Sequence, residues 1–435
     1  MEAIIKSDGA AYDVIIIGGG LAGLSCAVNL FERGYKPLIL EASDGIGGRI
    51  RTDDLDGYKL DRGFQVFLTR YPEAARILDY KKLNLANFKA GAIVRAKGRF
   101  IKVSDPFREP QAFVSMLVSD IAPMHDKVKI AYLRQSLINC PLQEIFRKSE
   151  KTIQQALEDY GFSSLMINRF FRPFFGGITL DPSLGTSSRI FDFIYKMMAE
   201  GNVAVPALGM GSLTAQLASR LPPECIRLST KVESVDKDKN FVTLADGKGS
   251  QNEARAIVVA AEGPEAARLL GLPDPGSRQA ICMYFACDKD KAPTDEPMLI
   301  LNGQLEDGGP INNLAVMSNV SSHYAPKDKA LISVTVLEHQ GRSDTDLLQA
   351  VIEQLQDWYG KQVSTDWHHL RTYRIHHAQP DQSPGSLEPP SRPVGIAHQL
   401  YVCGDHRETA SINGAIASGR KAALAAIQDL KIPHS

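Results

Sequence analysis

A glycine-rich turn that follows an apolar run constrains this chain more than any other feature. Residues 14–17 are Val-Ile-Ile-Ile, a β-branched run that predicts a strand buried on both faces of a parallel sheet. Gly18, Gly20 and Gly23 come next, in the spacing G-x-G-x-x-G. The first glycine permits a tight turn, the second lets backbone amides approach a pyrophosphate, and the third lets a helix pack close to the strand. This spacing predicts a nucleotide-binding turn.

A helix is expected after the turn, over residues 21–33, with Gly34 as a left-handed C-cap. Its first residues, Leu21 and Ala22, would present unpaired backbone amides at the N-terminus, where these groups and the helix dipole favour an anion. The expected ligand of the turn is therefore the diphosphate of a dinucleotide.

Glu41 is the acidic residue that such a site needs at its adenosine end. It follows a second predicted strand, residues 37–40, and lies about twenty residues beyond the glycines. A carboxylate there can accept hydrogen bonds from both ribose hydroxyls, and it would repel a 2′-phosphate. The strand–turn–helix–strand segment that ends at Glu41 therefore disfavours an NADP-type adenosine, and NAD and FAD remain as the candidate cofactors.

The loop after Glu41 distinguishes these two cofactors. Gly47-Gly48-Arg49 resembles the G-G-R extension of the FAD-dependent amine oxidase superfamily, which also contains phytoene desaturases and protoporphyrinogen oxidases. The resemblance implies that FAD is the cofactor, that the chain at Gly48 passes over the pyrophosphate, and that Arg49 offsets its charge. Without the preceding βαβ unit, the same residues would indicate only a solvated loop.

The C-terminus resembles the second FAD signature of the same superfamily. A predicted strand ends at Gly404-Asp405, and a helix is expected to begin near Ile412. The resemblance implies that Asp405 accepts a hydrogen bond from a ribitol hydroxyl, and that the amides of Ile412, Asn413 and Gly414 point at flavin N1 and O2. A helix N-terminus there would stabilise the negative charge that two-electron reduction leaves near N1.

Two further contacts with FAD are implied by the resemblance alone. Gly63, Phe64 and Gln65 follow a predicted strand, and they match the segment that passes under the flavin ring. Val232 matches the residue whose backbone amide and carbonyl pair with the adenine edge. For the first segment, an ordinary strand and turn is the alternative.

Length and charge set broad limits on the class of protein. At 435 residues the chain is too long for one ordinary core, so two domains are expected. The formal net charge of −1 does not favour nucleic acid as a partner. The six cysteines have neither pairing nor metal-ligand spacing, so no metal site is expected. The sequence shows no secretory signal and no run of about eighteen apolar residues. We therefore expect a protein of the cytoplasm or of an organelle stroma that is not secreted. It would be soluble or peripheral to a membrane.

The predicted fold class is α/β, with a Rossmann-like FAD-binding domain and a discontinuous substrate domain of antiparallel sheet plus helices. Residues 1–75, 204–265 and 394–435 are assigned to the FAD-binding domain, and residues 76–203 and 266–393 to the substrate domain. The substrate-domain elements expected are a small hairpin with arms at 92–95 and 99–102, strands within 280–287, 297–302, 313–317 and 331–337, a helix over 344–359 and a strand over 372–380. One strand is expected over 226–236, which returns the chain to the first domain.

A phenylalanine-rich passage, residues 169–189, is the most unusual part of the substrate domain. It predicts an aromatic wall at a chain reversal, and it resembles the segment that lines the substrate cavity in the phytoene desaturase-like branch. Phe174, Phe175 and Tyr284 are the candidate substrate residues, in a cavity that would suit an apolar molecule. Interdomain core is the alternative.

Residues 110–137 carry apolar side chains at helical spacing, which usually indicates core. A second interpretation is a helical face that lies on a membrane, with Lys127, Lys129 and Arg134 among the lipid headgroups. Peripheral membrane contact is therefore left open beside an ordinary solvated helix face.

The candidates for proton chemistry are His376, His377 and Gln65. Neighbouring residues in a strand face opposite ways, so at most one of the two histidines can face a cavity. True amine oxidases of the superfamily place an aromatic residue where this chain has Ser411, and a lysine on the strand equivalent to 280–287, where none occurs. These two departures put amine oxidation in doubt.

The sequence therefore predicts an FAD-dependent oxidoreductase that takes a hydride from an apolar, unsaturated or cyclic substrate onto flavin N5, with oxygen or a quinone as electron acceptor. Two alternatives remain open. One is a flavin amine oxidase, and the other is a prenyl-binding relative of the Rab GDP-dissociation inhibitors, which share the fold without using FAD.

Overall fold

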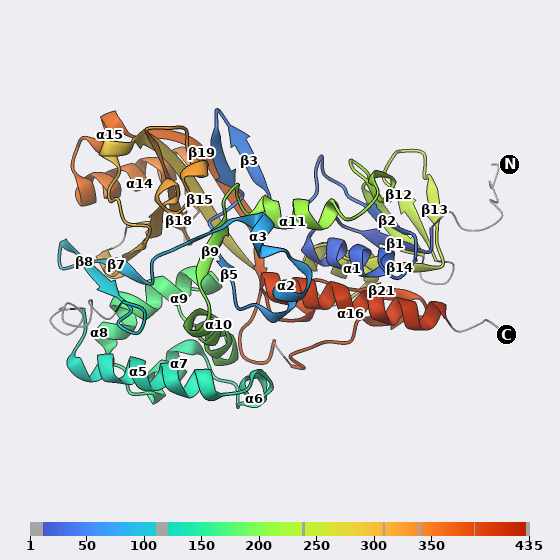
Figure 1. Ribbon diagram of the computed structural model, residues 1–435, viewed down its shortest axis with the longest axis horizontal. Helices are drawn as coiled ribbons and strands as arrows, with labels where there is room; N and C mark the ends of the chain where they lie inside the picture. Colours follow the sequence, from blue (N-terminus) through green and yellow to red (C-terminus); the bar gives the residue numbers. More distant parts are fainter. Residues whose placement is uncertain are drawn as a thin grey trace.

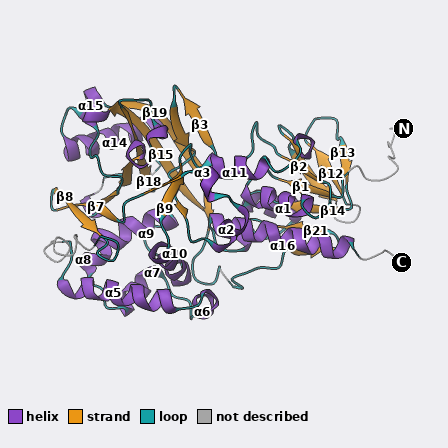
Figure 2. Cartoon of the chain, viewed as in Figure 1, coloured by secondary structure: helices purple, strands orange, loops and turns teal. Residues whose placement is uncertain are grey.

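The computed structural model describes residues 12–109, 121–236, 240–307, 309–337, 341–386 and 388–431. Two sheet-containing regions lie beside each other along the long axis of the molecule, and a group of helices lies under one of them (Figures 1 and 2). The nucleotide-binding motif and the C-terminal motif both belong to the same region, the one that contains β1 and α16 in Figure 1.

The first region is built on a six-stranded sheet, in the order β10-β2-β1-β14-β21-β20. Its strands are β10 (Ile226–Arg227), β2 (Pro37–Leu40), β1 (Val14–Ile17), β14 (Ala256–Val259), β21 (Leu400–Val402) and β20 (Gly395–Ala397). All neighbours are parallel except β20 and β21. Every residue of β1, β2 and β14 is buried, as expected for aliphatic strands covered on both faces. The predicted bounds of β1 and β2 are confirmed.

Helix α1 (Leu21–Phe31) follows the glycine turn and packs on the C-terminal helix α16 (Ile412–Leu430). The contact is very close: a Cβ on Gly419 would lie 2.1 Å from Ala22 O, and Ser25 Oγ donates to Ile416 O at 2.9 Å. The two ends of the chain therefore meet, side by side, in one packed unit (Figure 1).

The prediction that α1 runs to residue 33 and is capped by Gly34 is wrong. The helix ends at Phe31, and its C-cap Glu32 keeps a right-handed conformation. Gly34 takes a φ of +85° in the turn that follows, in which its amide bonds back to Phe31 O. The left-handed glycine therefore closes the turn after the helix rather than capping it.

The single strand predicted over 226–236 is also wrong, because the chain changes sheets within it. β10 pairs with β2 for two residues, Ser229 then takes a φ of +50°, and a separate three-stranded sheet begins. That sheet contains β11 (Val232–Asp236), β12 (Phe241–Leu244) and β13 (Gln251–Glu253). It packs with α12 (Gly263–Leu270), which leaves the end of β14.

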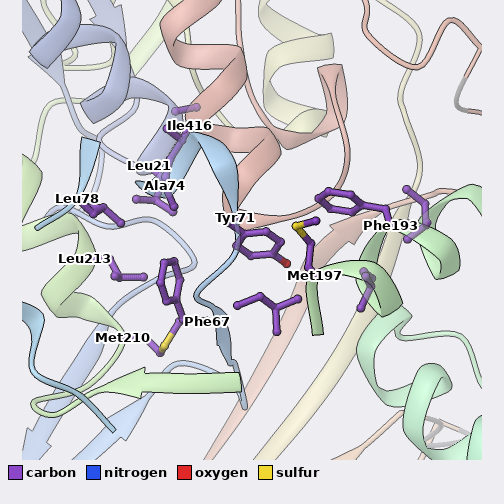
Figure 3. Close-up of a cluster of buried hydrophobic side chains, with 14 of the residues drawn as sticks. Leu21, Phe67, Tyr71, Ala74, Leu78, Phe193, Met197, Met210, Leu213 and Ile416 are labelled. Carbon is purple, nitrogen blue, oxygen red and sulfur yellow. The ribbon is translucent and has the colours of Figure 1, made fainter. Parts of the chain in front are cut away.

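A small group of elements connects the two regions. It consists of the hairpin β3 (Thr52–Leu55) and β4 (Tyr58–Asp61), the three-stranded sheet β5 (Phe67–Leu68), β9 (Val203–Pro206) and β6 (Leu85–Asn87), and the helices α2 (Pro72–Ile77), α3 (Tyr80–Leu83) and α11 (Gly211–Ala218). Figure 3 shows Tyr71 beside Phe193 and Met197, with Leu21 and Ile416 at the other end of the same buried cluster. Tyr71 stacks on Phe193 with ring centroids 6.0 Å apart. An apolar core thus joins α1 and α16 to the helices of the second region.

The second region is built on a seven-stranded sheet, in the order β19-β15-β18-β17-β16-β7-β8. Its strands are β19 (His368–Pro380), β15 (Ser277–Asp288), β18 (Lys329–Val336), β17 (Ile311–Val316), β16 (Leu299–Asn302), β7 (Gly91–Ala96) and β8 (Arg99–Ser104). The predicted hairpin is confirmed, but it joins this sheet through a parallel β7–β16 pair, so the sheet is mixed rather than purely antiparallel.

Helix α14 (Asp344–Tyr359), at the predicted bounds, and α15 (Val363–Asp366) cover one face of the seven-stranded sheet and bury its aliphatic side chains. The remaining short helical turns are η3 (Pro223–Cys225), η4 (Lys289–Lys291), η5 (Leu305–Asp307), α13 (Met317–Val320), η6 (Ser322–Tyr324) and η7 (Asp405–Arg407).

The phenylalanine-rich passage is helical, which corrects the predicted chain reversal. It contains a π-helical turn, η2 (Ile167–Phe171), followed by α9 (Arg172–Thr179), and the reversal comes at Leu180, with a φ of +54°. The other helices of this group are α5 (Met124–Asn139), α6 (Leu142–Arg147), α7 (Ile153–Asp159), α8 (Ser164–Met166) and α10 (Ser188–Glu200).

The basic side chains considered for a membrane face are turned toward the protein. Lys127 is buried, Lys129 donates to Gly161 O, and Arg134 donates to Ala199 O at 3.0 Å. Residues 110–120 of the predicted stripe lie outside the described residues. In the part of the chain that the structure describes, no helix has both the length and the apolar character needed to traverse a bilayer.

Candidate functional site

The glycine turn lies at the carboxyl edge of the parallel sheet, between β1 and β14. Open α/β sheets bind ligands at this edge where the strand order reverses, and here β2 lies on one side of β1 and β14 on the other. Gly18 has a φ of +111°, and a Cβ there would lie 2.7 Å from Ala260 O. A Cβ on Gly23 would lie 2.0 Å from Gly18 O. Both glycines are therefore required by backbone packing.

Gly20 differs from the other two glycines because a Cβ there would meet nothing within 4 Å. It is the N-cap of α1, and no side chain accepts a hydrogen bond from the first turn. Leu21 and Ala22 are buried, so only their backbone amides can serve a ligand. The start of α1 thus combines open space with the donor groups and the dipole that favour an anion.

Glu41 reaches back to the glycine turn. Its Oε2 accepts from the Gly19 amide at 2.6 Å, and its Oε1 accepts from the Ser43 amide at 2.8 Å and from Ser43 Oγ at 2.7 Å. These donors orient the carboxylate beside the turn, and Oε2, which accepts only from Gly19, keeps capacity for a further donor such as a ribose hydroxyl.

The loop after Glu41 folds back over the turn. Gly47 N donates to Gly19 O at 2.8 Å, and a Cβ on Gly48 would lie 3.5 Å from the Gly20 Cα. Arg49 then extends away from the glycines and donates to Asp405 Oδ1 at 2.6 Å and to Ala378 O at 2.9 Å. One guanidinium therefore joins the N-terminal motif, the C-terminal motif and β19.

Asp405 is the buried partner of this ion pair, with 8% of its side chain exposed against 30% for Arg49. Burial acts to raise the pKa of Asp405, but the Arg49 charge and hydrogen bond outweigh burial and hold that pKa below its usual value. Both residues line a solvent-open hollow of about 210 Å³, together with His377, Gln379 and His406. Gly404 precedes Asp405, and its amide donates to Ser418 Oγ at 3.0 Å.

Helix α16 follows the η7 turn that contains Asp405, and its own first turn is capped from within the chain. Ser411 is the N-cap, and its Oγ accepts from the Gly414 amide at 3.0 Å. Asn413 Oδ1 accepts from the Glu73 amide at 2.9 Å, which ties the helix start to α2. Of the three amides expected to face the flavin, Gly414 therefore already has an acceptor, and the roles of Ile412 and Asn413 stay predictions.

The segment at residues 63–65 is attached to the Arg49 loop. Gln65 Nε2 donates to Arg49 O at 2.8 Å, and the Phe64 ring meets Phe88 edge-on at 6.3 Å between centroids. Gly63 has a φ of +102°, and a Cβ there would lie 3.3 Å from Ile375 Cδ1 of β19. This turn therefore lies where the nucleotide region meets the second sheet.

The two neighbouring histidines of β19 face opposite ways, as strand geometry requires. His376 is exposed, whereas His377 is partly buried, lines the hollow with Arg49 and Asp405, and shares a 2.8 Å hydrogen bond between its Nδ1 and Ser277 Oγ. His406 lines the same hollow, and burial lowers its pKa to about 4, so it is neutral at pH 7.

The three candidate substrate residues occupy different environments. Phe175 is fully buried and packs on Phe191, with ring centroids 4.5 Å apart. Phe174 is only partly buried and stacks on Phe170, with ring centroids 5.5 Å apart. Tyr284 is 1% exposed, and its hydroxyl donates to Asp61 O at 2.9 Å. Phe174 is thus the most accessible of the three.

Val232 lies apart from the hollow, buried at the start of β11 next to a register shift opposite β12. Its position is tied to the Glu41 end of the site, because Thr230 N donates to Glu41 O at 2.8 Å and Ser229 N donates to Ser43 O at 2.8 Å. The residue expected at the adenine is therefore linked through the backbone to the residue expected at the ribose.

Sequence reasoning missed three residues that shape the site. The Gly19 amide and Ser43 hold the Glu41 carboxylate, and Ala378 supplies a carbonyl to Arg49. Ser43 could have been found from its spacing, since a serine two residues after a carboxylate commonly closes a local side-chain turn. No sequence signal indicates Ala378, because its side chain takes no part.

The site fits an FAD-type dinucleotide. An uncapped helix start beside open space suits a diphosphate, and an oriented carboxylate next to it suits a ribose. The region with β1 and α16 thus contains a continuous set of polar groups that runs from Glu41 to Asp405. In the part of the chain that the structure describes, no group of three or more histidine, cysteine, aspartate or glutamate side chains is placed to hold a metal ion.

Comparisons with known proteins agree with this geometry. A family model described as "Flavin containing amine oxidoreductase" matches residues 21–427. The chloroplastic/chromoplastic 15-cis-phytoene desaturase of Arabidopsis thaliana is 22% identical over 462 residues, which cover 96% of this chain and 80% of that protein. Among solved structures, a protein of Exiguobacterium sp. 255-15 provisionally described as a protoporphyrinogen oxidase superposes with a TM-score of 0.71 at 16% identity, covering 98% of this chain and all of the other. Putrescine oxidase bound to putrescine superposes with a TM-score of 0.68 at 15% identity, over 96% of this chain and 99% of the other.

Proposed function

We propose a function from the premise that this chain belongs to the family of flavin-containing amine oxidoreductases, whose model matches most of its length. It is an FAD-dependent oxidoreductase. We infer that its substrate is an apolar organic molecule, unsaturated or cyclic, that gives up a hydride. Family membership also sets aside the Rab GDP-dissociation inhibitor alternative, because those proteins do not use FAD.

The observation that carries this proposal is the contact of three distant segments at Arg49. Its guanidinium joins the Gly47–Arg49 loop to Asp405 of the C-terminal motif and to Ala378 of β19, the edge strand of the seven-stranded sheet. A cofactor held by the two motifs would therefore lie against the second sheet, where a substrate could reach it. In keeping with this, we assign residues 1–75, 204–265 and 394–435 to FAD binding and residues 76–203 and 266–393 to substrate binding.

The protein groups have separate roles in this scheme. The α1 amides at Gly20, Leu21 and Ala22 would bind the pyrophosphate, and Glu41 would accept from the adenosine ribose. Asp405, kept ionised by Arg49, would accept from a ribitol hydroxyl. When bound, FAD would supply a two-electron acceptor for the hydride, with oxygen or a quinone as the proposed final acceptor of the electrons.

The start of α16 and the turn at 63–65 would orient the isoalloxazine ring. The α16 dipole would stabilise negative charge near flavin N1. Gln65, held by Arg49 O, fixes the turn that would lie beneath the ring. His377 is the better placed of the two β19 histidines for proton transfer, since His376 is exposed to solvent.

Amine oxidation is the second candidate function, favoured by the fold shared with putrescine oxidase. The site argues against it at two positions. Ser411 stands where an amine oxidase needs an aromatic residue, and its hydroxyl is used to cap Gly414. β15 contains no lysine. An apolar substrate agrees better with the partly buried Phe170–Phe174 stack.

Anaerobic bleaching of the flavin tests both candidates. The purified protein should be yellow and should lose its visible absorbance with dithionite. Carotenes, porphyrinogens and amines are then added separately under anaerobic conditions. Bleaching by a polyene or a porphyrinogen, with none by amines, is the expected result. Bleaching by amines alone would establish the amine oxidase instead.

A further inference from the structure

A buried carboxyl group lies next to the turn at 63–65 and has no part in the scheme above. Asp61 ends β4 and is 1% exposed. Its Oδ1 accepts from Thr52 Oγ1 at 2.5 Å and from the Met210 amide at 2.9 Å, and its Oδ2 accepts from Tyr324 OH at 2.7 Å. Donors from β3, from the start of α11 and from η6 therefore converge on one carboxylate.

The backbone carbonyl of Asp61 connects the turn at 63–65 to the seven-stranded sheet. Its carbonyl oxygen accepts from the Gly63 amide at 2.8 Å and from Tyr284 OH at 2.9 Å. Gly63 begins the turn that Gln65 attaches to Arg49, and Tyr284 belongs to β15, which lies next to the edge strand β19 in the seven-stranded sheet. Asp61 is thus the point at which this turn is held to the substrate sheet.

In the part of the chain that the structure describes, the side chain of Asp61 has hydrogen-bond donors around it but no cation paired with it. The titratable groups that face it are Tyr324 from η6 and Tyr284 and Cys282 from β15, and burial raises the pKa of all three, so they stay neutral at pH 7. Thr52 from β3 and the Met210 amide are uncharged. Among the described residues, no ion pair includes Asp61, and burial raises its pKa to about 6.

Protonation would change the hydrogen bonds around this carboxyl group. An ionised carboxylate accepts all three donors, whereas a protonated one carries an O–H that must itself donate. Either the Tyr324 hydroxyl or the Thr52 hydroxyl would then have to turn away. The Asp61 carbonyl accepts from the amide of Gly63, the first residue of the turn. A rearrangement at Asp61 would therefore change the position of residues 63–65.

We infer that Asp61 is a positioning residue whose ionisation state sets how the 63–65 turn is held against the substrate sheet, and through that turn the environment of the flavin. This inference rests on the proposed function, because it takes the turn to lie beneath the isoalloxazine ring. Because Asp61 is buried, its proposed action is through the turn rather than by contact with substrate or cofactor.

The test is the visible spectrum of the FAD-loaded protein between pH 5 and pH 8. The wild-type protein should show a step in its flavin absorbance centred near pH 6. Asp61→Asn should abolish the step. Tyr324→Phe should move it to higher pH, because the lost hydroxyl donates to the charged oxygen and so favours ionisation. A purely structural role would not predict this shift.

Asp54→Asn is the matched control. Asp54 belongs to the same hairpin, but it is exposed and paired with Lys59, so the step should stay in place. The inference is overturned if wild type shows no step, if the step persists in Asp61→Asn, or if Tyr324→Phe leaves it in place or moves it to lower pH. Should Asp61→Asn not fold, the Tyr324→Phe shift decides alone.

A protein that binds no flavin would count against the proposed function and not against Asp61. The near-ultraviolet circular dichroism of the buried tyrosines then replaces the flavin spectrum. A pH step that is present in wild type and shifted in Tyr324→Phe would support the role of Asp61 in holding the turn, and its absence from wild type would overturn it.

Discussion

Helices α1 and α16 pack against each other near their N-terminal turns, yet these turns are completed in different ways (Figure 1). The N-cap of α1 is Gly20, and no side chain accepts from the first amides of that helix. The N-cap of α16 is Ser411, whose hydroxyl accepts from the Gly414 amide. Every helix start leaves four backbone donors without intrahelical partners. The first turn of α1 is therefore open to a ligand or to water, whereas that of α16 is partly satisfied by the chain itself.

The difference indicates that the two helix starts have different roles within one site. A bare glycine lets a diphosphate approach the backbone and its dipole closely, which a capping side chain would prevent. A capped start keeps α16 in place whether or not a ligand is bound. The close contact of Gly419 with Ala22 O holds the two helices in a constant relation. We therefore expect α1 to provide affinity and α16 to provide orientation.

Gly20→Ala should have the largest effect and is the sharpest test of this difference in roles. The new methyl group would enter the open space at the start of α1, so FAD affinity should fall by roughly a hundredfold or more through the loss of charged hydrogen bonds. The apoprotein should unfold at an unchanged temperature, because the site has room for a Cβ. Flavin titration and thermal melts measure the two quantities.

Two other glycines serve as controls for Gly20→Ala. Gly23→Ala should destabilise the apoprotein itself, since its Cβ would lie 2.0 Å from Gly18 O. Gly395→Ala, at an open position of β20, should change neither property. Unchanged flavin affinity in Gly20→Ala would show that the pyrophosphate does not lie at α1.

Glu41→Ala should have the next largest effect, again on the α1 side. Removal of a charged acceptor for ribose hydroxyls should weaken FAD binding by roughly thirtyfold, equivalent to about 2 kcal/mol. The FAD content of the purified protein and its dissociation constant are the measurements. Ser43→Ala is the control, because it removes one donor to Glu41 but leaves the carboxylate. Full FAD occupancy in Glu41→Ala would place the adenosine elsewhere.

Asp405→Asn tests the ion pair on the α16 side. It leaves the Arg49 charge without its partner and should lower the free energy of unfolding by about 2 kcal/mol at pH 7, less than for a fully buried pair because Arg49 is 30% exposed. Arg49 depresses the pKa of Asp405 in the folded state, so the stability that the pair contributes is complete above the ordinary aspartate pKa and is lost as the pH falls through the depressed value.

The difference between wild type and Asp405→Asn should therefore shrink below about pH 4 and stay constant between pH 5 and pH 8. Chemical denaturation at several pH values measures it. Asp44→Asn, which breaks an exposed pair with Arg51, should cause no measurable change at any pH. A difference that grows on acidification would contradict the assignment of Arg49 as the cause.

Ser411→Ala should have the smallest effect. Loss of the cap should cost about 1 kcal/mol of stability, with FAD affinity nearly unchanged, because the first turn of α16 is also held through Asn413. Thr152→Ala, at the capped start of α7, should cost a similar amount and leave the flavin spectrum alone. If Ser411→Ala weakened FAD binding as much as Gly20→Ala, the two helix starts would not differ in role.

Local patterns predicted the nucleotide region well. The bounds of β1 and β2 followed from runs of aliphatic residues, since strands buried on both faces need them at every position. Errors arose where the chain changes direction without a change in composition. Nothing in the residues after Ile226 shows that the chain leaves the first sheet after Arg227 and that Ser229 turns it into a second sheet.

The composition of the second region concealed its pairing in a similar way. The four strands between 280 and 337 and the 92–102 hairpin were each recognisable, but nothing in their residues indicates that β7 pairs with β16 in parallel. The phenylalanine-rich passage suggested a wall at a reversal, whereas its helical conformation buries Phe175 and leaves Phe174 partly accessible.

The sequence by itself determined that a dinucleotide turn exists and where its glycines and its acidic residue stand, because each of these requirements is met by residues close together in the chain. Only the tertiary structure decided that Arg49 pairs with Asp405 and that Asp61 receives donors from three other elements. Such contacts join residues up to 356 positions apart, and their energy depends on burial and direction that no local pattern encodes.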